Sequence, residues 1–226
     1  MNDNMKIIAH IHSDFPTKFG IPRQSGLAET EAVIVFTPEY RKEEALRGIE
    51  EFSHLWLIWK FSEAQRETWS PTVRPPRLGG NKRIGVFATR SPFRPNPIGL
   101  SSVKLLAVEK TAKFGTVLRV AGADLMDGTP IYDIKPYLAF TDSHPDASGS
   151  FADERKDYRL EVDFPSALLE NVPLDKQAAL VEILAGDPRP QYIDDPTRVF
   201  GFPFAGLEVR FTVKDGVLTV KEIEKI

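Results

Sequence analysis

Short apolar runs, bounded by glycine, proline or polar clusters, dominate the first two-thirds of this 226-residue chain and constrain its fold more than any other feature. Runs of this length that are rich in β-branched and aromatic residues are typical of strands. Many short strands with little intervening helix predict a mainly β fold, as a small closed barrel or a sandwich. The runs lie at residues 6–11, 31–36, 54–61, 84–89, 100–108 and 116–121.

The run at 54–61 is apolar on both strand faces, so we expect it to be buried on both. Trp56 and Trp59 lie inside it and are expected in the core, although an exposed indole could also stack on a nucleobase. One helix is expected before this run, beginning at Thr37 and ending at Gly48. The sequence therefore places one short helix among the strands.

A change of pattern divides the chain. Residues 141–153 have the polar, glycine- and proline-containing composition of a linker. A chain of this length accommodates one substantial domain and a small second one. We therefore expect a β domain at 1–145 and a small α+β domain at 146–226.

The C-terminal part contains three recognisable elements. Residues 158–164 alternate as a strand, and residues 174–184 form an amphipathic helix pattern closed by Gly186 at the C′ position. Residues 208–222 are predicted to form a terminal hairpin, with Asp215 and Gly216 as a type I′ turn. These elements predict a small α+β unit.

Composition excludes several kinds of chemistry. The chain has no cysteine, which rules out disulfides, thiolate nucleophiles and cysteine-ligated metals. Its four histidines show no metal-binding spacing, so we expect no metal site. No stretch is long and apolar enough to span a membrane, and the first residues do not resemble a signal peptide. We therefore expect a cytoplasmic protein with no membrane partner.

Residues 68–108 contain no acidic residue, although the formal net charge of the whole chain is −3. Such a local positive field on stiff, loop-forming backbone suits an anionic ligand, either nucleic acid or a nucleotide cofactor. The basic residues of this window are Arg74, Arg77, Lys82, Arg83, Arg90, Arg94 and Lys104.

The segment from Arg90 to Pro97 follows directly on the 84–89 run. Its closely spaced prolines fix the backbone, and Arg90 and Arg94 can bind a carboxylate or a phosphate. The alternative is a rigid corner that carries two solvated arginines. Glycine-rich phosphate-binding fingerprints of the Rossmann and P-loop types are missing, so a nucleotide-like cofactor would be bound by another device.

A second dense cluster runs from Asp124 to Tyr137. Asp127-Gly-Thr-Pro is turn chemistry in itself, and a turn with no further role is one interpretation. The strand that follows carries Asp133 and Lys135 on one face, because strand side chains alternate. A carboxylate beside an ammonium could handle a proton or hold a substrate.

Assembled in order, these motifs resemble the bacterial TrmO family, also called YaeB or TsaA. The resemblance is dense over residues 6–145 and resumes weakly at 187–192 and 209–211. Many relatives end the long apolar strand in Phe-His, whereas this chain has Phe61-Ser62. The motifs are Pro22-Arg-Gln24, Phe52-Ser-His-Leu-Trp56, Arg74-Pro-Pro-Arg-Leu-Gly-Gly80, Gly85 to Gly99, and Asp127-Gly-Thr-Pro with Asp133-Ile-Lys-Pro-Tyr137.

The resemblance implies a homodimeric enzyme whose β-barrel binds S-adenosylmethionine (SAM) without a Rossmann fold. It implies methylation of N6 of threonylcarbamoyladenosine at position 37 of a threonine tRNA. A non-catalytic SAM-sensing RNA-binding barrel and a small-molecule methyltransferase are the alternatives. The implied cofactor residues are Pro22, Arg23, Gln24, Phe61, Ser62, Arg90, Leu100, Leu125, Met126, Asp127, Gly128 and Thr129.

The remaining site residues divide between chemistry and tRNA binding. On the substrate side we select Asp133, Lys135 and Tyr137, with Asp133 as the candidate base for the N6 proton. The tRNA contacts are expected from the basic window. They are Arg74, Arg77, Lys82, Arg83, Arg94 and Asn96.

Overall fold

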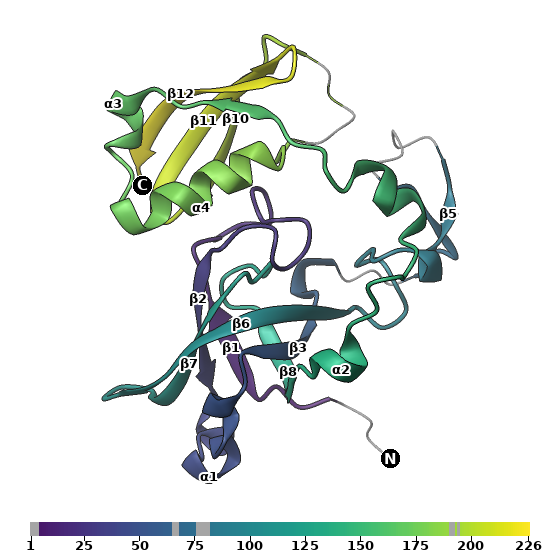
Figure 1. Cartoon of the computed structure of the whole chain (residues 1–226), viewed down its shortest axis with the longest axis vertical. Helices are drawn as coiled ribbons and strands as arrows, with labels where there is room; N and C mark the ends of the chain where they lie inside the picture. The colour runs from purple at the N-terminus through teal and green to yellow at the C-terminus, as the bar shows by residue number, and fades with distance from the viewer. Residues whose placement is uncertain (1–4, 65–67, 76–81, 190–192, 194) are drawn as a thin grey trace.

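The computed structural model describes residues 5–226 except 65–67, 76–81, 190–192 and 194. Figure 1 shows a lower β domain and an upper domain in which a sheet packs against a helix, joined by a long connection. The prediction of a mainly β chain is confirmed. Among the described residues, no helix has the length and apolar character needed to cross a membrane.

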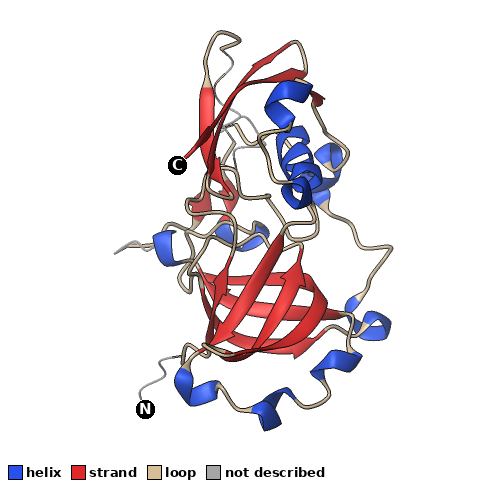
Figure 2. Cartoon of the chain, turned by 90° about the vertical axis from the view of Figure 1, so that its left-hand side faces the viewer, coloured by secondary structure: helices blue, strands red, loops and turns tan. Residues whose placement is uncertain are grey.

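In the described chain, the strands of the lower domain pair as a ring. Their order is β1-β2-β7-β6-β3-β8, and antiparallel pairing of Ala9 with Ile131 joins β8 back to β1 as a closed barrel. Figure 2 views the ring of strands from the side. The bounds are β1 Ala9–His12, β2 Glu31–Phe36, β3 His54–Lys60, β6 Ile98–Thr111, β7 Gly115–Ala121 and β8 Pro130–Pro136.

Five of the six apolar runs expected as strands lie in this barrel, and the run at 84–89 does not. Only Ile84–Gly85 (β5) is extended there, paired with Thr72–Val73 (β4) outside the barrel. The chain then turns through a 3-10 helix at Val86–Ala88. The backbone N–H of Thr89 bonds to the Val86 carbonyl and ends that turn, so the apolar run serves as a corner before the proline-rich segment.

The single helix expected from Thr37 to Gly48 is wrong. The chain forms two 3-10 turns, Pro38–Tyr40 and Ile49–Glu51, around a short α1 at Glu43–Leu46. Arg41 interrupts the helix because its guanidinium donates to the Phe36 carbonyl, at 3.0 Å from Nη2. A tertiary contact of the side chain thus overrides the local helix signal.

The expectation that β3 is buried on both faces is also wrong. Leu55, Leu57 and Trp59 point into the barrel core with at most 6% exposure, which confirms the prediction for Trp59. Trp56 lies on the outer face, half-buried, where it packs on Tyr137 at 5.5 Å between ring centroids. The apolar outer face of this strand is therefore available to line a cavity.

The upper domain is a sheet of strand order β10-β11-β12-β9 packed against α4 (Leu174–Ala185). The terminal hairpin is confirmed, with positive φ at Asp215 and Gly216 as a type I′ turn requires. Gly186 ends α4 with φ −71°, and the left-handed residue is instead Asp187. The strands are β9 Glu161–Asp163, β10 Phe200–Phe204, β11 Leu207–Lys214 and β12 Val217–Lys225, with short helices α2 Ala139–Asp142 and α3 Ser166–Leu169.

The connection from β1 to β2, residues 13–30, joins the two domains and is called the β1–β2 loop below. It runs between the barrel and the upper sheet (Figure 1). Phe15 is fully buried in the core of the upper domain, with its ring 5.5 Å from that of Phe204. Ala28 belongs to the same core. The barrel domain therefore supplies part of the hydrophobic core of its neighbour.

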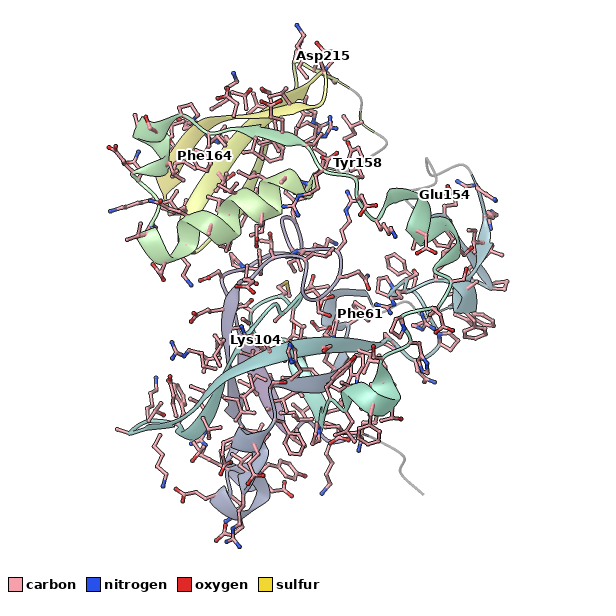
Figure 3. The ribbon with its side chains drawn as sticks, viewed as in Figure 1. Phe61, Lys104, Glu154, Tyr158, Phe164 and Asp215 are labelled. Carbon is pink, nitrogen blue, oxygen red and sulfur yellow. The ribbon has the colours of Figure 1, made fainter. Side chains whose placement is uncertain are left out.

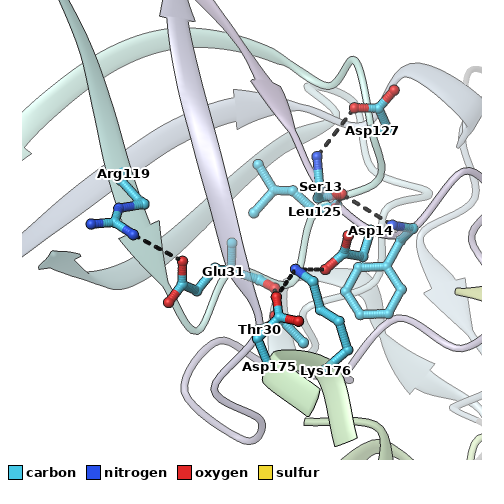
Figure 4. Close-up of polar contacts among 11 residues, drawn as sticks. Ser13, Asp14, Thr30, Glu31, Arg119, Leu125, Asp127, Asp175 and Lys176 are labelled. Atoms are coloured by element: carbon cyan, nitrogen blue, oxygen red, sulfur yellow. Dashed lines mark hydrogen bonds and ion pairs between the residues drawn. The ribbon is translucent and has the colours of Figure 1, made fainter. Parts of the chain in front are cut away.

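Polar contacts fix the same loop on both sides. Lys176 Nζ of α4 lies 2.6 Å from Asp14 Oδ2 (Figure 4). On the barrel side, Ser13 donates from its backbone N–H to Asp127 and from its hydroxyl to the Leu125 carbonyl. The loop is thus bonded to the barrel through Ser13 and to the upper domain through Asp14, so it sets how the domains meet.

Replacing Phe15 with alanine should destabilise the whole chain by about 3–5 kcal/mol, the usual cost of emptying a buried aromatic site. Chemical denaturation followed by circular dichroism measures it. Phe140→Ala is the matched control, because Phe140 is 89% exposed on α2 and should change stability by less than about 0.5 kcal/mol. Equal stability of the two variants would contradict a shared core.

Candidate active site

A cavity of about 950 Å³ opens beside the β1–β2 loop. This volume lies within the range of roughly 300–1,000 Å³ usual for ligand sites. Its walls come from four other parts of the barrel domain: the end of β3, the start of β6, the β7–β8 connection and residues 89–97, called the proline loop below. Segments distant in sequence thus meet at one concave surface.

Nine of the twelve residues expected to bind the cofactor line this cavity. They come from the β1–β2 loop, the end of β3, the proline loop, β6 and the β7–β8 connection, and Figure 3 labels Phe61 among them. Arg94 and Asn96, expected at the tRNA, line it as well. The nine are Pro22, Arg23, Gln24, Phe61, Ser62, Arg90, Leu100, Met126 and Thr129.

The two arginines of the proline loop have different partners. Arg94 donates through Nη1 to the carbonyl of Thr89 at 3.0 Å and to that of Ser91 at 3.3 Å. Its guanidinium thus holds the carbonyls of its own loop. Arg90 donates instead to the side-chain oxygen of Gln24, which also lines the cavity. One arginine therefore braces the loop, and the other joins it to the β1–β2 loop.

A buried relay of polar groups ends at Asp124 on the cavity wall. The indole N–H of Trp59 donates to Ser101 Oγ at 2.9 Å, and Ser101 Oγ donates to Asp124 Oδ1 at 2.5 Å. Ser101 is 1% exposed. Gly99 permits this arrangement, since a Cβ there would lie 2.2 Å from the Trp59 ring. The relay holds a carboxylate in the wall of the cavity.

Burial raises the pKa of Asp124 above its ordinary value. The hydrogen bond from Ser101, backbone donors and the positive charge of Arg90 act in the opposite direction but are outweighed. A carboxylate whose pKa is raised toward neutrality is a better proton acceptor than a solvated one. Such a group in a cavity beside a guanidinium is a candidate functional residue.

Residues 125–129 form the turn that their sequence predicts. Leu125 is 1% exposed and belongs to the barrel core. Asp127 accepts from the backbone N–H of Ser13, and the Gly128 N–H donates to the Ile11 carbonyl. Leu125, Asp127 and Gly128 are absent from the cavity lining, whereas Met126 and Thr129 contribute to it. The turn anchors the start of the β1–β2 loop.

Asp133, Lys135 and Tyr137 lie next to the cavity but do not line it. Asp133 and Lys135 form an ion pair of 3.1 Å on the outer face of β8. Their cross-strand neighbours on β3 are Ile58 and Trp56, and Trp56 lines the cavity. The three residues are thus separated from the cavity by one strand.

The residues expected at the tRNA backbone lie around the β4–β5 ribbon. Arg74 and Lys82 are exposed, and Arg83 donates to Thr72 Oγ1 at 2.9 Å. Arg77 lies outside the described residues. Beside them Trp69 and Phe87 are 52% and 73% exposed, with ring centroids 6.1 Å apart. Exposed aromatic rings next to basic side chains form a surface suited to unstacked nucleobases.

Sequence reasoning missed Ser101 and the role of Asp124. Asp124 lies at the start of a turn-rich cluster. Within that cluster the pattern favours Asp133 as the functional acid, because it shares a strand face with Lys135. A signal was present in Ser101 and Ser102, which fall among the apolar residues at the start of the strand. A polar residue in a barrel interior needs a hydrogen-bond partner, and this requirement points to a nearby acid.

Both domains match families of known proteins. Residues 10–143 match the tRNA-methyltransferase O N-terminal domain, and residues 157–226 match the TrmO C-terminal domain. The chain belongs to the TrmO family. The resemblance that the sequence motifs indicated is confirmed over both domains.

TrmO relatives are similar along nearly the full chain. A tRNA (adenine(37)-N6)-methyltransferase of Escherichia coli K12 is 41% identical over 226 residues, covering 96% of each protein. A putative SAM-dependent methyltransferase, RcsF, of Pseudomonas aeruginosa PAO1 is 38% identical over 220 residues, covering 93% of each. The crystal structure of TrmO from Pseudomonas aeruginosa matches with a TM-score of 0.77 and 31% identity, covering 99% of this chain and 100% of that one.

The raised pKa of Asp124 predicts an unusual stability effect. In the folded state the neutral carboxyl is favoured, so this contribution to stability is complete below the unfolded pKa and is lost as pH rises through the folded pKa. Asp124→Asn should therefore raise the thermal unfolding midpoint at pH 7, and the difference should shrink toward pH 4. Asp133→Asn, at an exposed ion pair, is the control and should give no such gain. A lower midpoint for Asp124→Asn at pH 7 would contradict this account.

Proposed function

We propose that this chain transfers the methyl group of SAM to N6 of adenosine 37 in tRNA. The observation that carries the proposal is the convergence of nine residues, assigned to the cofactor by family resemblance, on one cavity. The family match extends over both domains, and the Escherichia coli relative carries this activity in its name.

The chemistry of the lining suits SAM. Its carboxylate would be held by guanidinium groups, for which Arg23 and Arg90 are present. Its ammonium group or ribose hydroxyls require an acceptor, and Glu63, which also lines the cavity, supplies a carboxylate. The adenine ring requires an apolar or aromatic surface, which Phe61 and Phe93 offer. Each functional group of the cofactor thus has a complementary side chain in the cavity.

When bound, SAM supplies its methyl group on a sulfonium, so that transfer to N6 leaves a neutral thioether and releases the N6 proton. The side chains of this chain bind and align the two reactants, the main contribution required of a protein in such a displacement. Asp124 accepts the released proton, helped by its raised pKa. Ser101 keeps Asp124 oriented.

We propose that the tRNA approaches over Trp69, Phe87 and the basic residues of the β4–β5 ribbon. Asp133, Lys135 and Tyr137 lie on the adjacent outer face and would contact the same substrate. The target base is N6-threonylcarbamoyladenosine, whose carboxylate Arg94 would bind. This proposal assigns one end of the cavity to the cofactor and its mouth to the nucleotide.

Transfer of labelled methyl groups from SAM to bulk tRNA tests the function. We expect incorporation at adenosine 37 of threonine tRNA carrying the threonylcarbamoyl group, and at least tenfold less without that group. Binding of SAM with no labelling of modified tRNA would favour a non-catalytic sensor. Labelling of small molecules alone would favour a small-molecule methyltransferase.

Two variants separate the candidate bases in this assay. Asp124→Asn should lower kcat by about 10²–10⁴-fold, the usual contribution of a general base. Asp133→Asn should mainly raise the KM for tRNA. A large loss of kcat in Asp133→Asn, with only a raised KM for tRNA in Asp124→Asn, would identify Asp133 as the base instead.

We further propose that residues 1–145 form the SAM-binding barrel domain, residues 146–226 the small α+β domain, and that the protein acts as a cytoplasmic homodimer. The homodimer is what the resemblance to the family implies. Light scattering coupled to size exclusion should give twice the chain mass of 25.4 kDa at micromolar concentration. A single species at 25.4 kDa would contradict the homodimer.

A further inference from the structure

A hydrogen bond joins the β1–β2 loop to the upper domain beside the cavity. Arg23, which lines the cavity, donates from Nη2 to the backbone carbonyl of Asp187 at 2.8 Å. Asp187 follows α4 and has φ 55°, in the left-handed region that non-glycine residues seldom adopt. The carbonyl of a residue in the upper domain thereby fixes a side chain of the cofactor site.

The carboxylate of Asp187 stabilises this backbone conformation. It is 1% exposed and accepts from Arg189 Nε at 2.8 Å and Nη2 at 3.1 Å, a bidentate pair. The Tyr158 hydroxyl donates to Oδ2 at 3.1 Å, and the Arg189 backbone N–H donates to Oδ1 at 3.3 Å. Each carboxylate oxygen therefore has two donors, so the group is fully hydrogen-bonded.

The contacts continue from Arg23 to the proline loop. The side-chain amide of Gln24 donates to the Arg23 carbonyl, and Arg90 donates to the side-chain oxygen of Gln24. A continuous series of hydrogen bonds thus runs from Tyr158, at the joint between the domains (Figure 3), through Asp187 and Arg23 to Arg90. Its last members belong to the cavity.

We propose that Asp187, held by Tyr158 and Arg189, is a positioning residue that sets the conformation of Arg23 and so links the upper domain to cofactor affinity. The inference rests on the proposed binding of SAM in this cavity. Arg23 has several N–H donors in one plane, and the bond to Asp187 orients that plane. Pre-arranging such a side chain lowers the ordering cost of binding a carboxylate.

A purely structural role for Asp187 predicts something different. In that case its replacement would lower stability and leave the affinity of the folded protein for SAM unchanged. A positioning role predicts weaker SAM binding by folded protein, with turnover at saturating SAM largely retained. Affinity and stability measured on the same variants therefore separate the two.

The experiment compares Asp187→Asn and Tyr158→Phe with Glu222→Gln in the full-length protein. Glu222 forms an ion pair of 2.6 Å with Arg210 in the same domain, on strands away from the cavity. Calorimetry gives the SAM affinity, the methylation assay gives kcat and KM, and hydrogen exchange gives the protection of residues 13–25. Circular dichroism checks the fold of each variant.

We expect Asp187→Asn to raise the Kd and KM for SAM about tenfold, as loss of a charge-assisted contact does, and to change kcat less than about twofold. Tyr158→Phe should raise the Kd about threefold. Exchange in residues 13–25 should accelerate in both variants, whereas Glu222→Gln should match the wild type in every measurement.

Unchanged SAM affinity in folded Asp187→Asn would overturn the inference while leaving the proposed function intact. If Asp187→Asn does not fold, Tyr158→Phe becomes the deciding variant. Wild-type SAM affinity and wild-type hydrogen exchange in Tyr158→Phe would then overturn the inference. Absence of SAM binding by the wild type would instead overturn the proposed function and the inference together.

Discussion

The burial of Phe15 in the core of the neighbouring domain is the interaction on which the geometry of the cavity depends. A connection between two barrel strands would ordinarily be a mobile surface loop. Here its apolar side chain lies among Phe202, Phe204 and Phe211, and this burial offsets the entropy lost on ordering the loop. The segment that follows can then present Arg23 and Gln24 to the cavity in one conformation. The second domain therefore supports the cavity from behind the β1–β2 loop, although none of its described residues lines the walls.

The charged side chains around the cavity come from separate parts of the sequence. Acidic residues are missing from residues 68–108, so the proline loop and the ribbon present only positive charge. Two carboxylates, Asp124 and Glu63, come from elsewhere in the chain and line the cavity, and burial raises the pKa of Asp124. Burying an acid costs stability, and such costs concentrate at functional sites. The lining thus combines two carboxylates with guanidinium groups, which suits a ligand with both a carboxylate and cationic or hydroxyl groups.

The barrel strands were predictable because period-two patterns and turn residues act locally. The broken helix near Arg41 was not, since the contact of its guanidinium with Phe36 depends on the folded barrel. Phe15 gave no local signal, because its partners lie about 190 residues later in the chain. For the site, motif resemblance identified Arg90 and Gln24. Asp124 emerged only once Ser101 and the β7–β8 connection were brought together.

Residues that line the cavity and residues that only support it are hard to separate in a sequence. Leu125 and Asp127 share a motif with Met126, yet the first is in the core and the second anchors a turn. A strand or turn directs neighbouring side chains to opposite sides, so a contiguous motif divides into contact and support residues. Arg94 similarly braces the loop from which Arg90 reaches out.

The most direct test of the account is a crystal structure of this chain with S-adenosylhomocysteine, the product left by methyl transfer. The account predicts density in the cavity between the β1–β2 loop and the proline loop, with the ligand carboxylate at Arg23 or Arg90. It also predicts that the ligand leaves Asp124 accessible to the nucleotide. Ligand bound at another surface, or bound in the cavity without contact to these loops, would contradict it.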